Sequence, residues 1–395
     1  MRMLFTLFLI VLPWLSFLAT PMFSQSQLLD LTGFVDASAI YNKSQTNGES
    51  TATIQENHDD VNGFFAKIAI TGFVDVYFGY NFNRPTSRIN QLRNFDFRDQ
   101  RFCLNLGELA VTRIPEPFGF RLDLNYGPRT TDWIHASEPA NSELVQYVQQ
   151  AFVSYKAPVG KGLTVDVGKF VTQHGAEVIE TKDNWNYSRS LLFAWAIPYY
   201  HFGVRAGYPI HARFTFNTYL VNGWNNVVDN NRGKTFGLQG IWTPHRNVSF
   251  VLNYMVGPEQ ATNTSPVREL FDTVITFFAT PKLSLMLNYD YGRDRADTGA
   301  KVHWNGLAGY ARYSPTPWLT FSPRWEWFND SDGFATGQAQ ELTEVTITNE
   351  LRVAKNLFSR LEFRQDRSTV DFFENDSGKK RTQTTIVLGA FYVLP

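Results

Sequence analysis

Hydrophobic and polar residues alternate along most of the chain, from Thr71 to Leu394. Alternation with a period of two is typical of β-strands, because successive side chains point to opposite faces. The alternating segments are about ten residues long and their connections are by turns short and long, which is typical of transmembrane β-barrels. The sequence therefore predicts an all-β fold, a transmembrane antiparallel β-barrel with short periplasmic turns and long extracellular loops.

The connections between these segments predict the number of strands. The short joins lie at residues 114–116, 158–160, 209–210, 244–246, 280–281, 315–316 and 355–356. The long loops lie at residues 83–100, 128–143, 171–197, 224–233, 258–267, 294–302, 329–340 and 369–380. Six of the seven short joins contain a proline, which cannot donate to a strand ladder and so marks where pairing stops. Seven turns and eight loops predict sixteen strands, and an even number places both chain ends on the periplasmic side.

Each expected strand has an apolar face and a polar face with charges of both signs. In the segment 357–368, Leu361 and Phe363 alternate with Arg360 and Arg364. Tyrosine and tryptophan gather near the strand ends, where aromatic girdles mark the two membrane interfaces. We expect the polar faces to line a lumen, where their charges either set ion preference or form salt bridges that stiffen the wall. The candidate pore-lining residues are Asp75, Arg121, Asp123, Asp166, His201, Arg205, Arg324, Glu326, Glu344, Arg352, Arg360 and Arg364.

Three positions fit this alternation poorly. Pro323 lies inside an expected strand and predicts a bulge. Lys169 falls on the apolar face unless Gly168 shifts the register or the lysine side chain extends to the rim. Glu108 falls on the same face as Phe102, and the pattern offers no reason for it.

The N-terminal part of the chain divides into two segments before the barrel. Residues 1–26 begin with a basic residue, continue as an apolar run and end in small and polar residues, which predicts a secretory signal peptide. The motif Thr-Gly-Phe-Val-Asp occurs at 32–36 and again at 71–75, and we take the second copy as the first barrel strand. Residues 27–63 are then an extension that lies in the periplasm, partly plugs the lumen or adds a strand. The barrel is expected over 64–395.

Composition agrees with a barrel and excludes other classes. The chain has 395 residues, is 43% hydrophobic and carries a net charge of -1, and its mean hydropathy is -0.25. Half of each barrel strand faces water, so hydropathy alone resembles that of a soluble protein. After the leader there is no apolar run of about 18 residues, hence no expected helical span. The near-neutral charge gives no reason to expect nucleic-acid binding.

Neither an enzyme nor a metal site is expected. Seven histidines are present, and His201 and His211 lie close in sequence but without the Glu or Cys spacing of a metal site. A serine nucleophile beside a histidine on the outer wall is also missing, as is a glycine-rich phosphate loop. Cys103 is the single cysteine, so no internal disulfide can form. We therefore predict no catalytic residues, no cofactor and no metal.

Several motifs resemble those of a known family. They are Gly-Phe-Arg-Leu-Asp-Leu-Asn-Tyr-Gly at 119–127, Gly-Lys-Phe at 168–170, Gly-Ala-Glu-Val-Ile-Glu at 175–180, Asn-Tyr-Ser-Arg-Ser-Leu-Leu-Phe at 186–193, Ile-Pro at 197–198 and His-Phe-Gly-Val-Arg at 201–205. Together they resemble the outer-membrane β-barrel porins of the OmpL-like class, the β-barrel porin-2 family. The resemblance covers roughly residues 71–395 and implies an outer-membrane pore of unassigned substrate. The doubled opening motif and the final Pro395, in place of a terminal aromatic residue, depart from what is usual.

The longest loop, 171–197, is the expected constriction. A barrel of about sixteen strands leaves an aqueous channel, which something must narrow if passage is to be selective. If the loop folds inward, its acids would face Arg121, Arg205 and Arg324 and set up a transverse field. The alternative is a surface loop with solvated charges. The constriction-loop candidates are His174, Glu177, Glu180, Lys182, Asp183 and Arg189.

These patterns together predict an outer-membrane porin of Gram-negative type that passes small hydrophilic solutes and ions by passive diffusion. The alternatives are a closed outer-membrane barrel acting as an adhesin or anchor, and a secreted soluble β-protein that binds carbohydrate. The expected partners are outer-membrane lipid and lipopolysaccharide, the solutes, the barrel-insertion machinery and, as one option, two further copies in a homotrimer. Since charges of both signs occur together, we expect weak ion selectivity.

Overall fold

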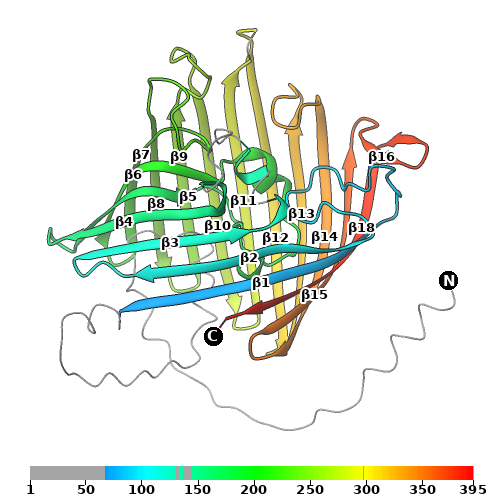
Figure 1. Cartoon of the computed structure of the whole chain (residues 1–395), viewed down its shortest axis with the longest axis horizontal. Coiled ribbons are helices and arrows are strands. Elements are labelled where there is room, and N and C mark those ends of the chain that lie inside the picture. Colours follow the sequence, from blue (N-terminus) through cyan, green and yellow to red (C-terminus); the bar gives the residue numbers. More distant parts are fainter. Residues whose placement is uncertain (1–66, 130–132, 137–144, 297, 395) are drawn as a thin grey trace.

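The computed structural model describes residues 67–129, 133–136, 145–296 and 298–394. The expected signal peptide, 1–26, and the extension, 27–63, lie outside the described residues. Sixteen strands close into one antiparallel barrel in chain order, with β1 pairing β18 to complete the ring (Figure 1). The predicted number of strands is therefore confirmed, and β1 contains the second copy of the repeated motif.

The strand boundaries follow the alternation of the sequence. The barrel strands are β1 (Ile68–Asn81), β2 (Arg101–Arg113), β3 (Phe118–Tyr126), β4 (Val148–Ala157), β5 (Leu163–Val171), β6 (Tyr200–His211), β7 (Phe214–Val221), β8 (Thr235–His245), β9 (Val248–Gly257), β10 (Arg268–Thr280), β11 (Leu283–Arg295), β12 (Lys301–Thr316), β13 (Leu319–Asp330), β14 (Gln340–Ala354), β15 (Leu357–Ser368) and β18 (Thr382–Val393). A small hairpin, β16 (Phe373–Asn375) and β17 (Gly378–Lys380), stands in the last long loop. Short helical turns occur at η2 (Val145–Tyr147), η3 (Thr181–Asp183) and η4 (Leu192–Ala196).

Burial separates the two faces of the wall as the alternation predicts. In β15, Arg360, Glu362 and Arg364 are buried inside the barrel, whereas Leu361 and Phe363 are exposed on the outer face that meets lipid. Among the described residues, no helix combines the length and the apolar character needed to cross a membrane.

Three of the prolines that mark short joins lie slightly before the turn itself. Pro209, Pro244 and Pro315 fall within the last residues of β6, β8 and β12. At each of these strand ends the pairing register shifts by one or more residues. The proline interrupts the ladder and the irregular end follows, so the chain reverses one to three residues later than the sequence indicates.

A bulge explains the position of Glu108. Val76 of β1 pairs Leu104, but the preceding Asp75 pairs Leu106, which leaves Asn105 as an extra residue in β2. The extra residue reverses the parity of the strand, so Glu108 is buried inside the barrel whereas Phe102 is 88% exposed outside.

Pro323 does not produce the bulge that its position predicts. It pairs Ile347 of β14 in regular register. On its other side the ladder with β12 lacks pairs between Tyr310–Arg324 and Tyr313–Phe321, and the register is the same before and after this gap. Proline has no N–H to donate, so the strand loses hydrogen bonds to one neighbour without shifting.

Lys169 is on the outer face but is covered by protein, so neither predicted explanation is correct. Its pairing with β4 and β6 is regular across Gly168. The Nζ atom lies 3.1 Å from Nδ1 of His135 and 4.2 Å from the centroid of the Tyr200 ring. The described part of the second long loop, 133–136, thus supplies a partner for a lysine on the outer wall.

Candidate functional site

The segment between β5 and β6 enters the barrel and crosses its lumen. Figure 1 shows it as a green coil within the ring of strands. Near its start, Ala176 N–H donates to Asn288 Oδ1 of β11 at 3.3 Å. Near its middle, Asn186 Nδ2 donates to the Ser322 carbonyl of β13 and to Thr348 Oγ1 of β14, both at 2.8 Å. We call residues 172–199 the lumen loop.

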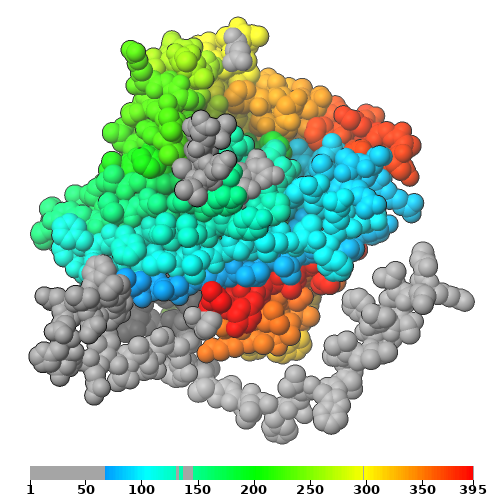
Figure 2. Space-filling view, viewed as in Figure 1, coloured from blue at the N-terminus to red at the C-terminus, as the bar shows by residue number. Residues whose placement is uncertain are grey.

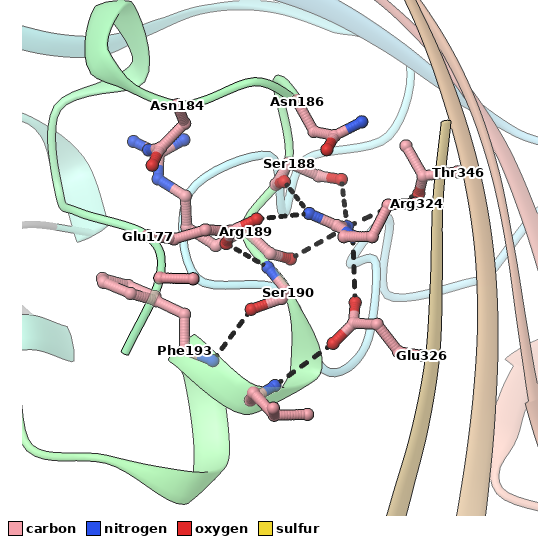
Figure 3. Close-up of polar contacts among 12 residues, drawn as sticks. Glu177, Asn184, Asn186, Ser188, Arg189, Ser190, Phe193, Arg324, Glu326 and Thr346 are labelled. Carbon is pink, nitrogen blue, oxygen red and sulfur yellow. Dashed lines mark hydrogen bonds and ion pairs between the residues drawn. The ribbon is translucent and has the colours of Figure 1, made fainter. Parts of the chain in front are cut away.

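Arg324 of β13 is the main junction between the lumen loop and the far wall (Figure 3). Its Nη1 lies 2.8 Å from Oε1 of Glu177 and also donates to the Ser188 carbonyl at 2.8 Å. Its Nε lies 3.0 Å from Glu326 and 3.1 Å from Glu344. One fully buried guanidinium therefore joins one loop carboxylate to two wall carboxylates, and such charge-assisted contacts are the strong class of hydrogen bonds.

Wall carboxylates also bind the backbone of the lumen loop. Glu362 of β15 accepts the N–H groups of Tyr187 at 2.6 Å and Ser188 at 3.0 Å. Glu326 accepts the N–H of Leu191 at 2.8 Å, just where η4 begins. Buried backbone donors need such partners because the loop forms no strand ladder there.

Two further arginines of β15 hold loop carbonyls. Arg360 donates to the carbonyls of Thr181 at 2.8 Å and Asn184 at 2.7 Å. Arg364 donates to the Arg189 carbonyl at 2.6 Å. The lumen loop is therefore held by side chains of both signs along one sector of the wall.

Part of the first long loop, residues 92–97, also lies inside the barrel, which the alternation of the sequence did not indicate. Arg93 pairs Asp96 at 2.5 Å and Asp366 of β15 at 3.0 Å, and all three side chains are buried. The Arg189 guanidinium lies over the Phe95 ring, with Cζ 4.3 Å from the ring centroid. A usable signal was present, since residues 82–100 contain more large apolar residues than a solvated loop needs.

Comparison with known proteins agrees with this geometry. The family model "Putative beta-barrel porin-2, OmpL-like" matches residues 67–394. The chain belongs to this porin family. A search of curated proteins found no match.

Solved structures support the fold of the porin. The anion-selective porin from Comamonas acidovorans is 10% identical, with a TM-score of 0.57 over 83% of this chain and 99% of that chain. The outer membrane channel DcaP of Acinetobacter baumannii is 11% identical, with a TM-score of 0.56 over 83% and 97%. OmpT of Vibrio cholerae in a trimer form is 12% identical, with a TM-score of 0.55 over 83% and 99%. The protein is an outer-membrane porin with a closed sixteen-strand barrel.

The porin's candidate site residues divide by burial. In the lumen loop, His174, Glu177, Glu180 and Arg189 are buried, whereas Lys182 and Asp183 are partly exposed. On the wall, Arg121 and Arg205 are partly exposed and Arg352 is exposed near a periplasmic turn. The remaining wall candidates are buried: Asp75, Asp123, Asp166, His201, Arg324, Glu326, Glu344, Arg360 and Arg364.

Two of the three bases expected to face the loop acids pair with carboxylates of the wall instead. Arg121 pairs Asp123 and Arg205 pairs Asp166, both at 2.8 Å and both within the wall. Arg324 does meet a loop acid, Glu177, but in direct buried contact at 2.8 Å. The bases are therefore neutralised locally, and the geometry does not support the expected transverse field between loop acids and these arginines.

Burial changes the ionisation of two groups in the lumen loop. Burial raises the pKa of the Glu180 carboxyl, although the Lys182 ammonium opposes this shift. Burial, assisted by His201, lowers the pKa of His174 well below its usual range. His174 is thus neutral at neutral pH. His201 is buried against a protein partner, since its Nδ1 lies 2.9 Å from the Gly223 carbonyl oxygen.

Acid should loosen the second long loop through His135. Burial and the neighbouring Lys169 lower the pKa of His135 from 6.5 to about 3. In a detached loop this imidazole would gain a proton below about pH 6.5, whereas the docked form stays neutral, so acid favours detachment. At about 1.4 kcal/mol per pKa unit, acidification to about pH 4.5 should cost up to about 3 kcal/mol of docking. Hydrogen exchange of the backbone amides of residues 133–136, measured against pH, gives this loss of docking free energy.

His135→Gln is the matched variant for that experiment. Because glutamine does not titrate, exchange of 133–136 in this variant should be independent of pH over the same range once intrinsic rates are removed. Equal acid sensitivity in both proteins would assign the effect to another group.

Proposed function

We propose that the porin passes small hydrophilic solutes and ions by passive diffusion beside the lumen loop, between residues 180–183 and the wall formed by β2 to β6. The observation that supports this path is that side chains beside it are partly exposed to solvent. The Arg121 side chain is 39% exposed, Lys182 is 24% exposed and Asp183 is 23% exposed, although all belong to the barrel interior or its loop. By contrast, the side chains that join the loop to β13 and β15 are buried.

The charges beside this path favour a weak preference for cations. Three carboxylates, Asp123, Glu180 and Asp183, lie with two bases, Arg121 and Lys182. Since burial raises the pKa of Glu180, its negative charge is present only above that raised value, and the preference should weaken as pH falls.

Glu180→Gln tests this assignment. Removing one charge at a distance on the order of 8 Å in water changes the energy of each permeating ion by about 0.5 kcal/mol, with opposite sign for cations and anions, so the cation-to-anion permeability ratio should fall about fivefold. The reversal potential of planar bilayers in a salt gradient gives this ratio. Asp376→Asn, an exposed carboxylate in the last extracellular loop, is the matched control and should leave the ratio unchanged. An anion preference in the wild type, or equal effects of the two variants, would contradict the proposed path.

Two further expectations stay with this proposal. We infer that the porin catalyses no reaction, and among the described residues no group of three or more His, Cys, Asp or Glu side chains could hold a metal ion. A homotrimer is supported by the trimer form described for one structural neighbour. Analytical ultracentrifugation in density-matched detergent would give the number of copies.

A further inference from the structure

One sector of the extracellular rim carries bases that form no ion pair among the described residues. The sector consists of the first long loop and the segment around the β16–β17 hairpin, which touch where Ser87 N–H donates to Glu374 at 3.0 Å and Asn83 Nδ2 donates to the Thr382 carbonyl at 2.7 Å. Figure 2 shows the blue loop against the red hairpin at the right rim. The bases without a carboxylate partner are Arg84, Arg88, Arg98, Arg101, Arg367, Lys379 and Lys380.

The charge of this sector is strongly positive. Arg381, which lies 3.6 Å from Asp371, brings the bases to eight. The carboxylates at the surface of the sector are four, Glu341, Asp371, Glu374 and Asp376, whereas Asp96 and Asp99 are buried beneath it. We call this the basic rim.

The opposite side of the same rim differs, because three of its bases pair with carboxylates. Arg268 pairs Asp294 at 2.7 Å and Arg293 pairs Glu269 at 2.6 Å. Lys234 also pairs with Asp229. The barrel therefore gathers uncompensated positive charge at one sector, where an anionic partner would have the largest favourable interaction.

Lipid-facing aromatic side chains lie directly next to the basic rim. Phe102 follows Arg101 in sequence, is 88% exposed and packs with Phe78 at a centroid distance of 4.8 Å. Phe82, exposed by half, packs edge-on against Tyr80 at 5.1 Å. A molecule bound here would meet apolar rings and unpaired guanidinium groups side by side. That combination fits a lipid with an anionic headgroup better than it fits a soluble anion.

We propose that the basic rim is a binding site for a phosphate-bearing lipid of the outer leaflet, with phosphates on the unpaired bases and acyl chains along Phe102 and Phe82. Guanidinium groups match phosphate oxygens by paired hydrogen bonds, and several such groups in one sector suit a headgroup with more than one phosphate. The inference does not depend on the channel being open.

The test uses the full chain in detergent, titrated with fluorescent lipid A that carries two phosphates. In the triple variant Arg84→Gln, Arg88→Gln, Lys379→Gln, the dissociation constant should rise at least about tenfold, since charge-assisted contacts are lost. The matched control is Arg232→Gln, Lys234→Gln, Arg295→Gln on the opposite rim, which should change it less than about twofold. Both variants should keep the heat-shifted gel mobility and single-channel conductance of the wild type, which shows that they fold.

Three outcomes would overturn the assignment. The triple variant could bind as tightly as the wild type, the control could lose as much affinity, or lipid A without phosphates could bind equally well. Complete displacement of lipid A by millimolar inorganic phosphate would assign the bases to a soluble anion instead. A tenfold loss confined to the triple variant, with weak binding of phosphate-free lipid A, supports the proposal.

Discussion

Shortening the lumen loop should increase single-channel conductance at least about twofold, because the loop fills the cross-section that sixteen strands would otherwise leave open. The structure indicates where to cut. Glu177 accepts the Ser190 N–H at 2.6 Å, so the chain nearly closes on itself there, and residues 178–188 can be replaced by two glycines. Arg324 and Arg360 lose loop partners but gain water in the widened lumen.

The matched control shortens a loop outside the barrel. Deleting residues 261–265, which lie in an exposed extracellular loop, removes a comparable connection without touching the lumen. Its conductance in planar bilayers should equal that of the wild type. Equal conductance of all three proteins would mean that the lumen loop does not limit passage, and it would not contradict the barrel fold.

Replacing Arg324 with methionine should destabilise the porin by about 3–5 kcal/mol, the usual cost of leaving buried charge unpaired. The change removes the contacts to Glu177 and Glu326, and leaves Glu344 with Arg364 at 3.6 Å. The free energy of unfolding, measured in urea with lipid vesicles, gives this loss directly. Conductance should also become noisier, since the loop is then held at fewer points.

Two further variants make the Arg324 experiment specific. Arg352→Met changes an exposed arginine whose side chain donates only to the Lys355 carbonyl among the described residues, and it should cost less than about 0.5 kcal/mol. Adding Glu326→Gln to Arg324→Met removes one uncompensated carboxylate and should recover part of the lost stability. A single variant as stable as the wild type would show that the junction does not hold the loop.

The sequence predicts the barrel because each strand repeats one local rule. Leu361 and Phe363 alternate with Arg360 and Arg364, and no information from distant parts of the chain is needed to assign their faces. The rule fails where pairing with a neighbour decides the outcome. The Asn105 bulge depends on the register of β1 against β2, which no alternation within β2 contains.

The candidate site was only partly predictable, for the same physical reason. Loop length and the requirement for a constriction identify the lumen loop from sequence alone. The contacts that hold it join residues far apart in the chain, such as Glu177 and Arg324, which are 147 positions apart. The burial of Arg93 and Phe95 in the first long loop likewise depends on the lumen loop beside them. Such pairs form only because the closed barrel brings these residues together, so they cannot be predicted from local sequence patterns.

The most direct test of the account is single-channel conductance of the purified, refolded wild-type porin in a planar bilayer, with boiled protein as the control. The path beside Arg121 and Lys182 predicts steady current steps that are absent from the boiled sample, together with a reversal potential of cation sign. Protein that shows β-structure and heat-shifted gel mobility but carries no current would contradict the open path. It would mean that the loops packed into the lumen close the barrel, as expected of an adhesin or anchor.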